Sequence, residues 1–217
     1  MTEIKFCGMT RPEDASLAAV LGATYVGVVF AGGPRQVTED RAVRILTGLP
    51  RRVARAAVFG AEDPREIARK AARLELNVVQ LHADPRGRDV DAVRAEWRDG
   101  QVWAVVRAGG ADLPGHMQEL MATADAILLD SRSEAALGGT GVTLPWDRLA
   151  TALEAVGRPP RLVLAGGLRA ENVAEAIRAL SPDVVDVSSG VESQVGIKDP
   201  ARMRAFRDAV YTARKEQ

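Results

Sequence analysis

The sequence alternates between short runs rich in β-branched residues and longer amphipathic runs, and this alternation limits the possible folds more than any other feature. The strand-like runs are "IKFC" (4–7), "YVGVVF" (25–30), "VARAAVF" (53–59), "NVVQLH" (77–82), "QVWAVVRA" (101–108), "AILLD" (126–130), "RLVLAG" (161–166) and "VVDVSS" (184–189). Strands that alternate with helices form parallel sheets with right-handed crossovers. Eight such units in 217 residues predict an α/β fold, a closed (β/α)8 TIM barrel. An open doubly wound sheet is the alternative, but no G-x-G-x-x-G fingerprint follows the first strand.

The predicted helices are marked by apolar residues at three- and four-residue spacing and by the composition of their first turns. Pro12 and Glu13 suit the first turn of a helix, and Thr38 is a candidate N-cap before acidic residues. The helical runs are 12–22, 38–49, 64–75, 117–124, 145–157, 170–180 and 199–215. Because no Pro-, Gly- or Ser-rich linker divides these units, we expect residues 1–217 to form a single barrel domain.

The charge and cysteine content exclude several classes of protein. Lys plus Arg equals Asp plus Glu at 29 each, and no basic stripe occurs, which argues against nucleic acid or an anionic membrane as the partner. A single cysteine rules out an internal disulfide and fits a reducing compartment. The N-terminus does not resemble a signal peptide, and no apolar run approaches the ~18 residues of a membrane span. We therefore expect a cytoplasmic protein that acts on a small molecule.

Reactive side chains stand at the predicted strand ends, where the active sites of such barrels lie. Cys7 ends the first strand, and it is either a small buried hydrophobe or a nucleophile or base. Asp130 ends the sixth strand, where it either caps a turn or acts as a general acid. The two residues could flank a small substrate from opposite sides, as acid–base isomerisation requires. His82 ends the fourth strand and, taken alone, is more typical of a hydrogen-bonded packing residue than of a metal ligand.

Glycine-rich loops follow the last three strands. They are "LGGTGV" (137–142), "LAGGL" (164–168) and "DVSSGVES" (186–193). Any one of them could be only a tight turn, but successive backbone N–H groups after strands seven and eight are the usual phosphate site of a barrel. The predicted substrate-binding positions in these loops are Gly139, Gly141, Gly166, Gly167, Ser189 and Gly190.

Other charged and metal-binding chemistry is sparse. His82 and His116 are the only histidines, and neither has a paired cysteine or an acidic cluster nearby in the sequence, so we expect no metal site and no cofactor. Lys5 shares the inward face of the first strand with Cys7 but lies too deep for a Schiff-base aldolase. We expect Asp186 on the eighth strand to be its partner.

Taken in order, the motifs resemble those of the phosphoribosylanthranilate isomerase family of tryptophan biosynthesis. "IKFCGMT" resembles the family's K-[IV]-C-G-[IL]-T opening, and it is followed by "QLH" (80–82), "LLD" (128–130), "GGTG" (138–141), "GGL" (166–168), "ENV" (171–173) and "DVSSGVE" (186–192). The resemblance covers essentially the whole chain. It implies an Amadori rearrangement of N-(5-phosphoribosyl)anthranilate to 1-(2-carboxyphenylamino)-1-deoxyribulose 5-phosphate. Cys7 would be the general base and Asp130 the general acid, without a cofactor, in a monomer or homodimer.

The resemblance also implies that Arg35, in "GGPRQVT", meets the anthranilate carboxylate and that His82 contacts the substrate. The sequence departs from the family pattern at Val142 and Leu144, where Lys and Phe are common, and at Ala104, where Lys is frequent. These departures bear on loop charge and substrate affinity and leave the acid–base pair intact.

Two rival functions fit the same fold. The sister ribosyl isomerase of histidine biosynthesis, or an isomerase that serves both pathways, would carry an Asp at the end of the first strand, and Cys7 argues against it. A barrel that binds a phosphorylated ligand without turning it over would not need both Cys7 and Asp130. A turnover assay separates these alternatives.

Overall fold

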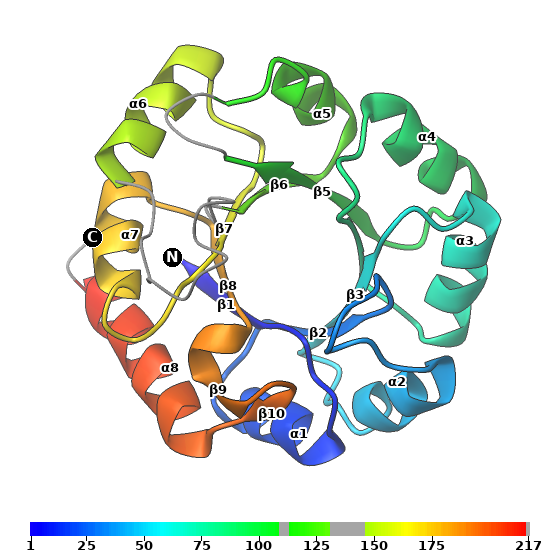
Figure 1. The fold of residues 1–217 in the computed structure, drawn as a ribbon, viewed down its shortest axis with the longest axis horizontal. Helices are drawn as coiled ribbons and strands as arrows, with labels where there is room; N and C mark the ends of the chain where they lie inside the picture. Colours follow the sequence, from blue (N-terminus) through cyan, green and yellow to red (C-terminus); the bar gives the residue numbers. More distant parts are fainter. Residues whose placement is uncertain (109–112, 131–145, 216–217) are drawn as a thin grey trace.

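A closed ring of parallel strands runs through the centre of the molecule (Figure 1). The computed structural model describes residues 1–108, 113–130 and 146–215. The barrel strands are β1 (Glu3–Phe6), β2 (Tyr25–Val29), β3 (Ala54–Phe59), β4 (Val78–Leu81), β5 (Gln101–Arg107), β6 (Ala126–Asp130), β7 (Leu162–Ala165) and β8 (Val184–Val187). They pair in chain order, and β1 closes the ring against β8. The predicted (β/α)8 barrel is confirmed, with strand ends shifted by no more than two residues.

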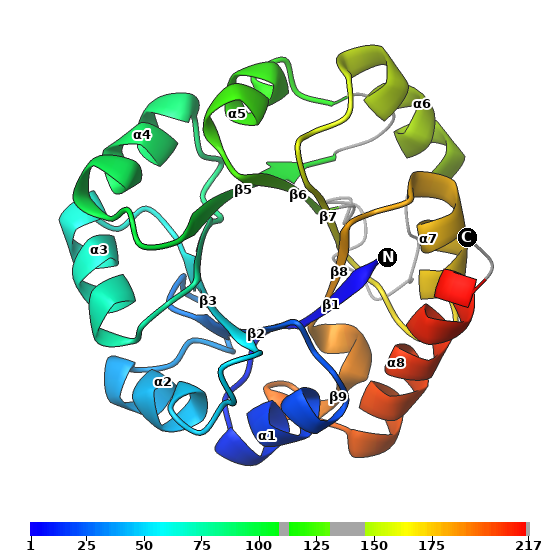
Figure 2. The same ribbon diagram turned by 180° about the vertical axis from the view of Figure 1, so that it is seen from behind.

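Helices surround the barrel on all sides (Figure 2). They are α1 (Pro12–Val20), α2 (Glu39–Leu46), α3 (Pro64–Arg73), α4 (Gly87–Glu96), α5 (Met117–Thr123), α6 (Trp146–Val156), α7 (Val173–Leu180) and α8 (Pro200–Lys215). The predicted N-cap is confirmed, because the Thr38 hydroxyl accepts a hydrogen bond from the backbone N–H of Arg41 at 3.3 Å. Helix α4 was not predicted, since Val90 and Val93 give it too short an apolar pattern. No helix among the described residues has the length and apolar character that a membrane crossing requires.

The core has two layers, because successive side chains of a strand point to opposite faces of the sheet. The outer layer packs the strands against the helices. Inside the barrel, the Tyr25 and Trp103 rings meet edge to face with centroids 4.9 Å apart, among smaller residues such as Ala56 and Val163. Packed aromatic and aliphatic side chains fill the barrel interior near the ends where the strands begin. The opposite end of the barrel, where the strands finish, is left for a site.

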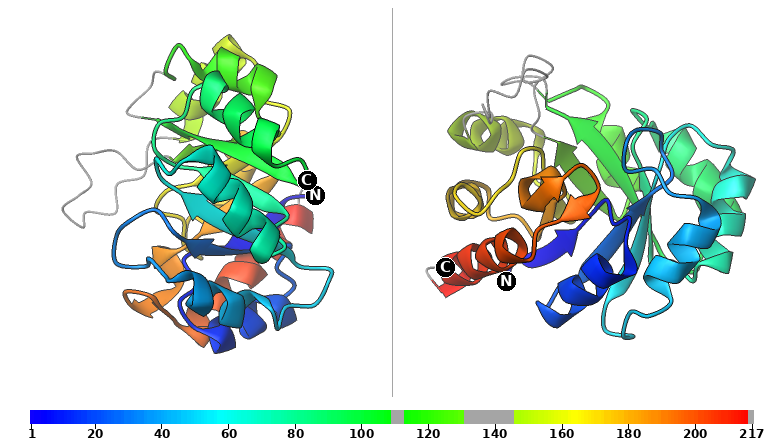
Figure 3. Two further views of the ribbon diagram at one scale, coloured as in Figure 1. Left: turned by 90° about the vertical axis from the view of Figure 1, so that its right-hand side faces the viewer. Right: turned by 60° about the horizontal axis from the view of Figure 1, so that its bottom comes forward.

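A small hairpin separates β8 from α8 and was not predicted. It follows the single turn η2 (Ser189–Val191) and consists of β9 (Glu192–Gln194) and β10 (Ile197–Lys198). The hairpin lies on the side of the barrel opposite the start of β1 (Figure 3, left). The backbone N–H of Lys198 donates to Asp14 of α1 at 3.2 Å, which fixes the hairpin against that helix. The hairpin therefore lies against α1, close to the end of the barrel where β8 finishes.

Candidate active site

One cavity opens at the carboxyl ends of the barrel strands. Its lining includes every described residue that the sequence predicted for the site, namely Cys7, Arg35, His82, Asp130, Gly166, Gly167, Ser189 and Gly190. Gly139 and Gly141 lie outside the described residues, as do Val142 and Leu144. Apolar side chains of Val29, Val58 and Leu128 complete the walls. The cavity thus combines apolar walls with a few polar groups, as small-molecule sites do.

Cys7 follows directly after β1 and is 7% exposed at the cavity. Its neighbour across the sheet is Gly27 of β2, where an added Cβ would lie 2.9 Å from the Cys7 sulfur and 3.4 Å from Cε of Lys5. Only glycine leaves room for the thiol at that point. Burial raises the pKa of the Cys7 thiol, and the positive charge of Lys5 acts against that rise.

Below the thiol, Lys5 is fully buried and fully paired. Its Nζ donates to Asp186 at 2.7 Å and to Gln80 at 2.9 Å, so the predicted Lys5–Asp186 pair is confirmed. Strand alternation directs Lys5 inward, and the register of β1 with β8 places the two residues side by side. Burial alone would lower the pKa of Lys5, but the adjacent Asp186 carboxylate and Cys7 raise it. A fixed positive charge therefore lies beneath Cys7.

On another side of the ring, Asp130 is the last residue of β6 and is partly exposed in the cavity. His82 follows β4 and lines the same cavity. Burial lowers the pKa of His82, which favours a neutral imidazole. The Nδ1 atom of His82 is buried, and it has no hydrogen-bond partner within the described part of the chain. The hydrogen-bonded packing role that the sequence suggested for His82 is therefore not found at this atom.

The loops after β7 and β8 form one wall of the cavity. Gly166 and Gly167 adopt left-handed φ angles of 94° and 67°, which favour glycine. A Cβ on Gly190 would lie 1.9 Å from the carbonyl oxygen of Leu168, so the two loops touch only because Gly190 has no side chain. Asn172 holds the first loop in place through its bond to the Gly167 carbonyl at 3.2 Å. Backbone of this kind can approach an anion closely.

Arg35 reaches the cavity from the loop after β2, and hydrogen bonds hold its guanidinium group in place. Its Nε and Nη2 each donate to Glu192 at 2.7 Å, and Lys198 donates to the same carboxylate at 3.0 Å. Burial opposes the ionisation of Glu192, but the two cations outweigh it and lower the pKa of the carboxyl. Neither Glu192 nor Lys198 was predicted from the sequence as a site residue. Glu192 stood in the quoted "DVSSGVE" motif, but nothing in the sequence paired it with Arg35.

The family model described as N-(5'-phosphoribosyl)anthranilate (PRA) isomerase matches residues 4–209. A protein from Pseudomonas aeruginosa of the same name is 40% identical over 215 residues, covering 99% of this chain and 97% of the relative. A Geobacter sulfurreducens protein of that name is 41% identical over 207 residues, covering 95% and 97%.

Solved structures agree with the sequence relatives. The crystal structure of phosphoribosyl anthranilate isomerase from Thermotoga maritima superposes with a TM-score of 0.84 at 34% identity, covering 98% of this chain and all of that one (100%). A second structure, of a phosphoribosyl anthranilate isomerase in complex with reduced 1-(o-carboxyphenylamino)-1-deoxyribulose 5-phosphate, superposes with a TM-score of 0.80 at 33% identity, covering 98% of this chain and 100% of that one. Each of these two structures covers nearly the whole of this chain.

Proposed function

The chain belongs to the N-(5'-phosphoribosyl)anthranilate isomerase family of tryptophan biosynthesis, and from this premise we propose that Cys7 and Asp130 divide the acid–base work of the rearrangement. The observation that carries the proposal is their placement, since both side chains line one cavity from different strands of the ring. A base and an acid on different sides can act on neighbouring atoms of one small substrate.

The reaction begins at the sugar ring. Asp130 gives a proton to the furanose oxygen, the bond from that oxygen to C1′ breaks, and the amine nitrogen lone pair forms an imine at C1′. The Cys7 thiolate then removes the proton from C2′, and the electron pair moves through C1′ to the nitrogen to give an enolamine. Return of a proton to C1′ and loss of the C2′ hydroxyl proton give the amino-ketose. The steps move protons and bonds within one molecule and consume no cofactor.

The two ends of the substrate need different partners. Backbone of the Gly166–Gly167 loop and of Ser189–Gly190 lines the cavity and suits the phosphate group. Arg35 suits the aryl carboxylate, because a planar guanidinium binds a carboxylate through two parallel hydrogen bonds. The neutral imidazole of His82 is left to contact the sugar between them.

A turnover assay tests this function against its rivals. The protein, purified from a host that lacks its own isomerase of this type, is mixed with N-(5'-phosphoribosyl)anthranilate, and loss of the substrate's fluorescence is followed. We expect conversion to the amino-ketose and no conversion of the histidine-pathway aminoaldose. Binding without turnover would point to a non-catalytic barrel, and turnover of both compounds to a dual-substrate isomerase.

The oligomeric state is a separate question. A phosphoribosylanthranilate isomerase from Thermotoga maritima is described as dimeric and was converted to monomers. For this chain a monomer and a homodimer both remain predictions, and light scattering during size-exclusion chromatography decides between them.

A further inference from the structure

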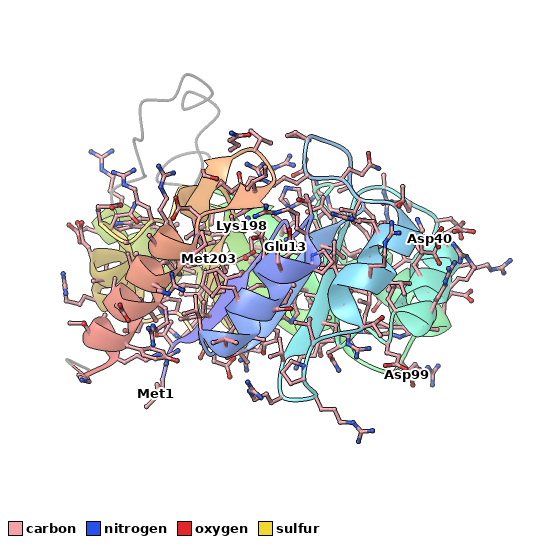
Figure 4. All side chains as sticks on the ribbon, turned by 90° about the horizontal axis from the view of Figure 1, so that it is seen from below. Met1, Glu13, Asp40, Asp99, Lys198 and Met203 are labelled. Carbon is pink, nitrogen blue, oxygen red and sulfur yellow. The ribbon has the colours of Figure 1, made fainter. Side chains whose placement is uncertain are left out.

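A network of three charged side chains joins the hairpin to the cavity. Lys198 is fully buried, Glu192 is 5% exposed and Arg35 is 22% exposed, so the network runs from the interior toward the cavity. In Figure 4 Lys198 lies where the hairpin meets α1 and α8. Its Nζ also donates to the carbonyl oxygen of Ser188 at 3.0 Å, within the predicted phosphate loop after β8.

The contacts of Arg35 use one edge of the guanidinium. Glu192 occupies the edge made by Nε and Nη2, with both distances at 2.7 Å. Among the described residues, no hydrogen bond to Nη1 of Arg35 occurs, so Nη1 and the second hydrogen of Nη2 form a free edge. A second carboxylate can bind that edge through two further hydrogen bonds.

The aliphatic part of Arg35 is also fixed. A Cβ on Gly8 would lie 2.7 Å from Cδ of Arg35 and 2.7 Å from Oγ of Ser188. The arginine stem thus lies directly over the glycine that follows Cys7. Packing of the aliphatic part of Arg35 against Gly8 and the hydrogen bonds of its guanidinium to Glu192 together restrict the direction of the free edge.

The charges in this network do not cancel. A lone Arg35–Glu192 pair would be neutral and would attract an anion weakly. Lys198 adds a second positive charge, because its Nζ donates at 3.0 Å to the same Glu192 oxygen, Oε1, that accepts from Nε of Arg35. The group of three therefore carries one excess positive charge beside the cavity, and a bound carboxylate would neutralise it.

We propose that Glu192 and Lys198 are positioning residues for Arg35: Glu192 fixes the direction of its free edge, and Lys198 offsets the charge of Glu192 so that Arg35 can still attract the aryl carboxylate of the substrate. This inference rests on the proposed function. It goes beyond that function by assigning the carboxylate specificity to a hairpin that makes no direct contact with the reacting atoms.

The test compares two ligands that differ only in the carboxylate. One is the reduced product, 1-(o-carboxyphenylamino)-1-deoxyribulose 5-phosphate after reduction, and the other has a plain phenyl ring. Dissociation constants are measured by calorimetry for each protein, and their ratio is the discrimination. We expect wild type to prefer the carboxylated ligand by roughly tenfold to a hundredfold, and Arg35→Ala to bring the ratio near one.

Two variants separate orientation from charge. Lys198→Met leaves Arg35 clamped but makes the pair neutral. Glu192→Gln/Lys198→Met keeps one positive charge and removes the bidentate clamp. Both should lower the discrimination several-fold while the phenyl ligand binds as it does to wild type. The double variant removes the two buried charges of Lys198 and Glu192 together, so it should fold even if the single variant does not. Glu75→Gln, which breaks the Arg55–Glu75 pair (2.6 Å) away from the cavity, is the control and should not change the ratio.

The result that overturns the inference is a folded double variant, shown by circular dichroism, with the wild-type ratio. Equal loss of affinity for both ligands would also overturn it, since that would mean a structural role only. Retention of the wild-type ratio by Arg35→Ala would remove its premise. The turnover assay on wild type is read independently, so failure of the isomerase proposal and failure of this inference give different results.

Discussion

Lys5 and Lys198 are both fully buried, but they lie in different surroundings. Lys5 lies inside the barrel, and its carboxylate partner Asp186 lies next to it on β8 at 2.7 Å. Lys198 lies in the hairpin outside the barrel and shares Glu192 with Arg35. Burial lowers the pKa of Lys198, whereas the neighbours of Lys5 raise its pKa despite burial.

The difference shows how one kind of ion pair can serve two purposes. The Lys5 pair is nearly self-contained, and its charge acts on the thiol of Cys7 above it. The Lys198–Glu192 pair is not neutral by itself, because Glu192 also pairs with Arg35. The three side chains together carry one net positive charge, and Arg35 is the member that reaches the cavity. We therefore expect changes around Lys5 to alter kcat and pH dependence, and changes around Lys198 to alter KM.

The largest effect is expected for Cys7→Ala. Loss of a positioned base should lower kcat by ~10² to 10⁴, because the C2′ proton then has no acceptor. The alanine fills nearly the same space, so melting temperature should change little. Steady-state kinetics measure the effect, and a folded variant with more than a tenth of wild-type activity would show that Cys7 is not the base.

Arg35→Ala should act on the other region. We expect KM for the anthranilate substrate to rise by about 10- to 150-fold with a smaller change in kcat, since charged hydrogen bonds contribute roughly 1.5–3 kcal/mol. Inhibition by ribose 5-phosphate provides the comparison. If that inhibitor loses affinity to the same degree, Arg35 does not recognise the anthranilate end.

Gly27→Ala changes the position of the Cys7 thiol without removing any functional group. The new methyl would lie 2.9 Å from the Cys7 sulfur, so the thiol must shift. We expect kcat to fall about tenfold, within the hundredfold that a misplacement of ~1 Å can cost. Gly48→Ala is the matched control, because nothing lies within 4 Å of a Cβ there. Equal activity of the two variants would mean that Gly27 does not set the thiol position.

The smallest effect is expected in the pH profile. The thiol is inactive when protonated, so kcat/KM should rise with pH through the pKa of Cys7, which burial places above the usual thiol range. In Lys5→Met/Asp186→Asn both charges are lost, and the effect of Lys5 on Cys7 exceeds that of Asp186. The rising limb should therefore move to higher pH. A limb that stays in place or moves to lower pH would contradict the proposed link between Lys5 and Cys7.

The two regions also differ in how far the sequence predicted them. Lys5, Cys7 and Asp186 lie on strands, where alternation sets the face and chain order sets the neighbour, so their meeting was predictable. The Arg35–Glu192 contact joins the loop after β2 to the first residue of β9, 157 residues further along the chain, and no periodicity relates such positions. The hairpin was missed for the same reason, since β9 and β10 have three and two residues. The need for glycine at position 27 could not be predicted either, because it depends on the distance to the Cys7 sulfur across the sheet.

In the proposed mechanism Asp130 opens the sugar ring before Cys7 removes the C2′ proton, so trapping the intermediate between these two steps tests the assignment of acid and base. Excess enzyme is mixed with N-(5'-phosphoribosyl)anthranilate and cyanoborohydride, which reduces an imine at C1′ to a stable open-chain amine that chromatography measures. Cys7→Ala should accumulate the imine and yield the amine well above the level without enzyme. Asp130→Asn, which cannot donate the proton, should yield no more than that level. Equal trapping by the two variants would contradict the proposed division between acid and base.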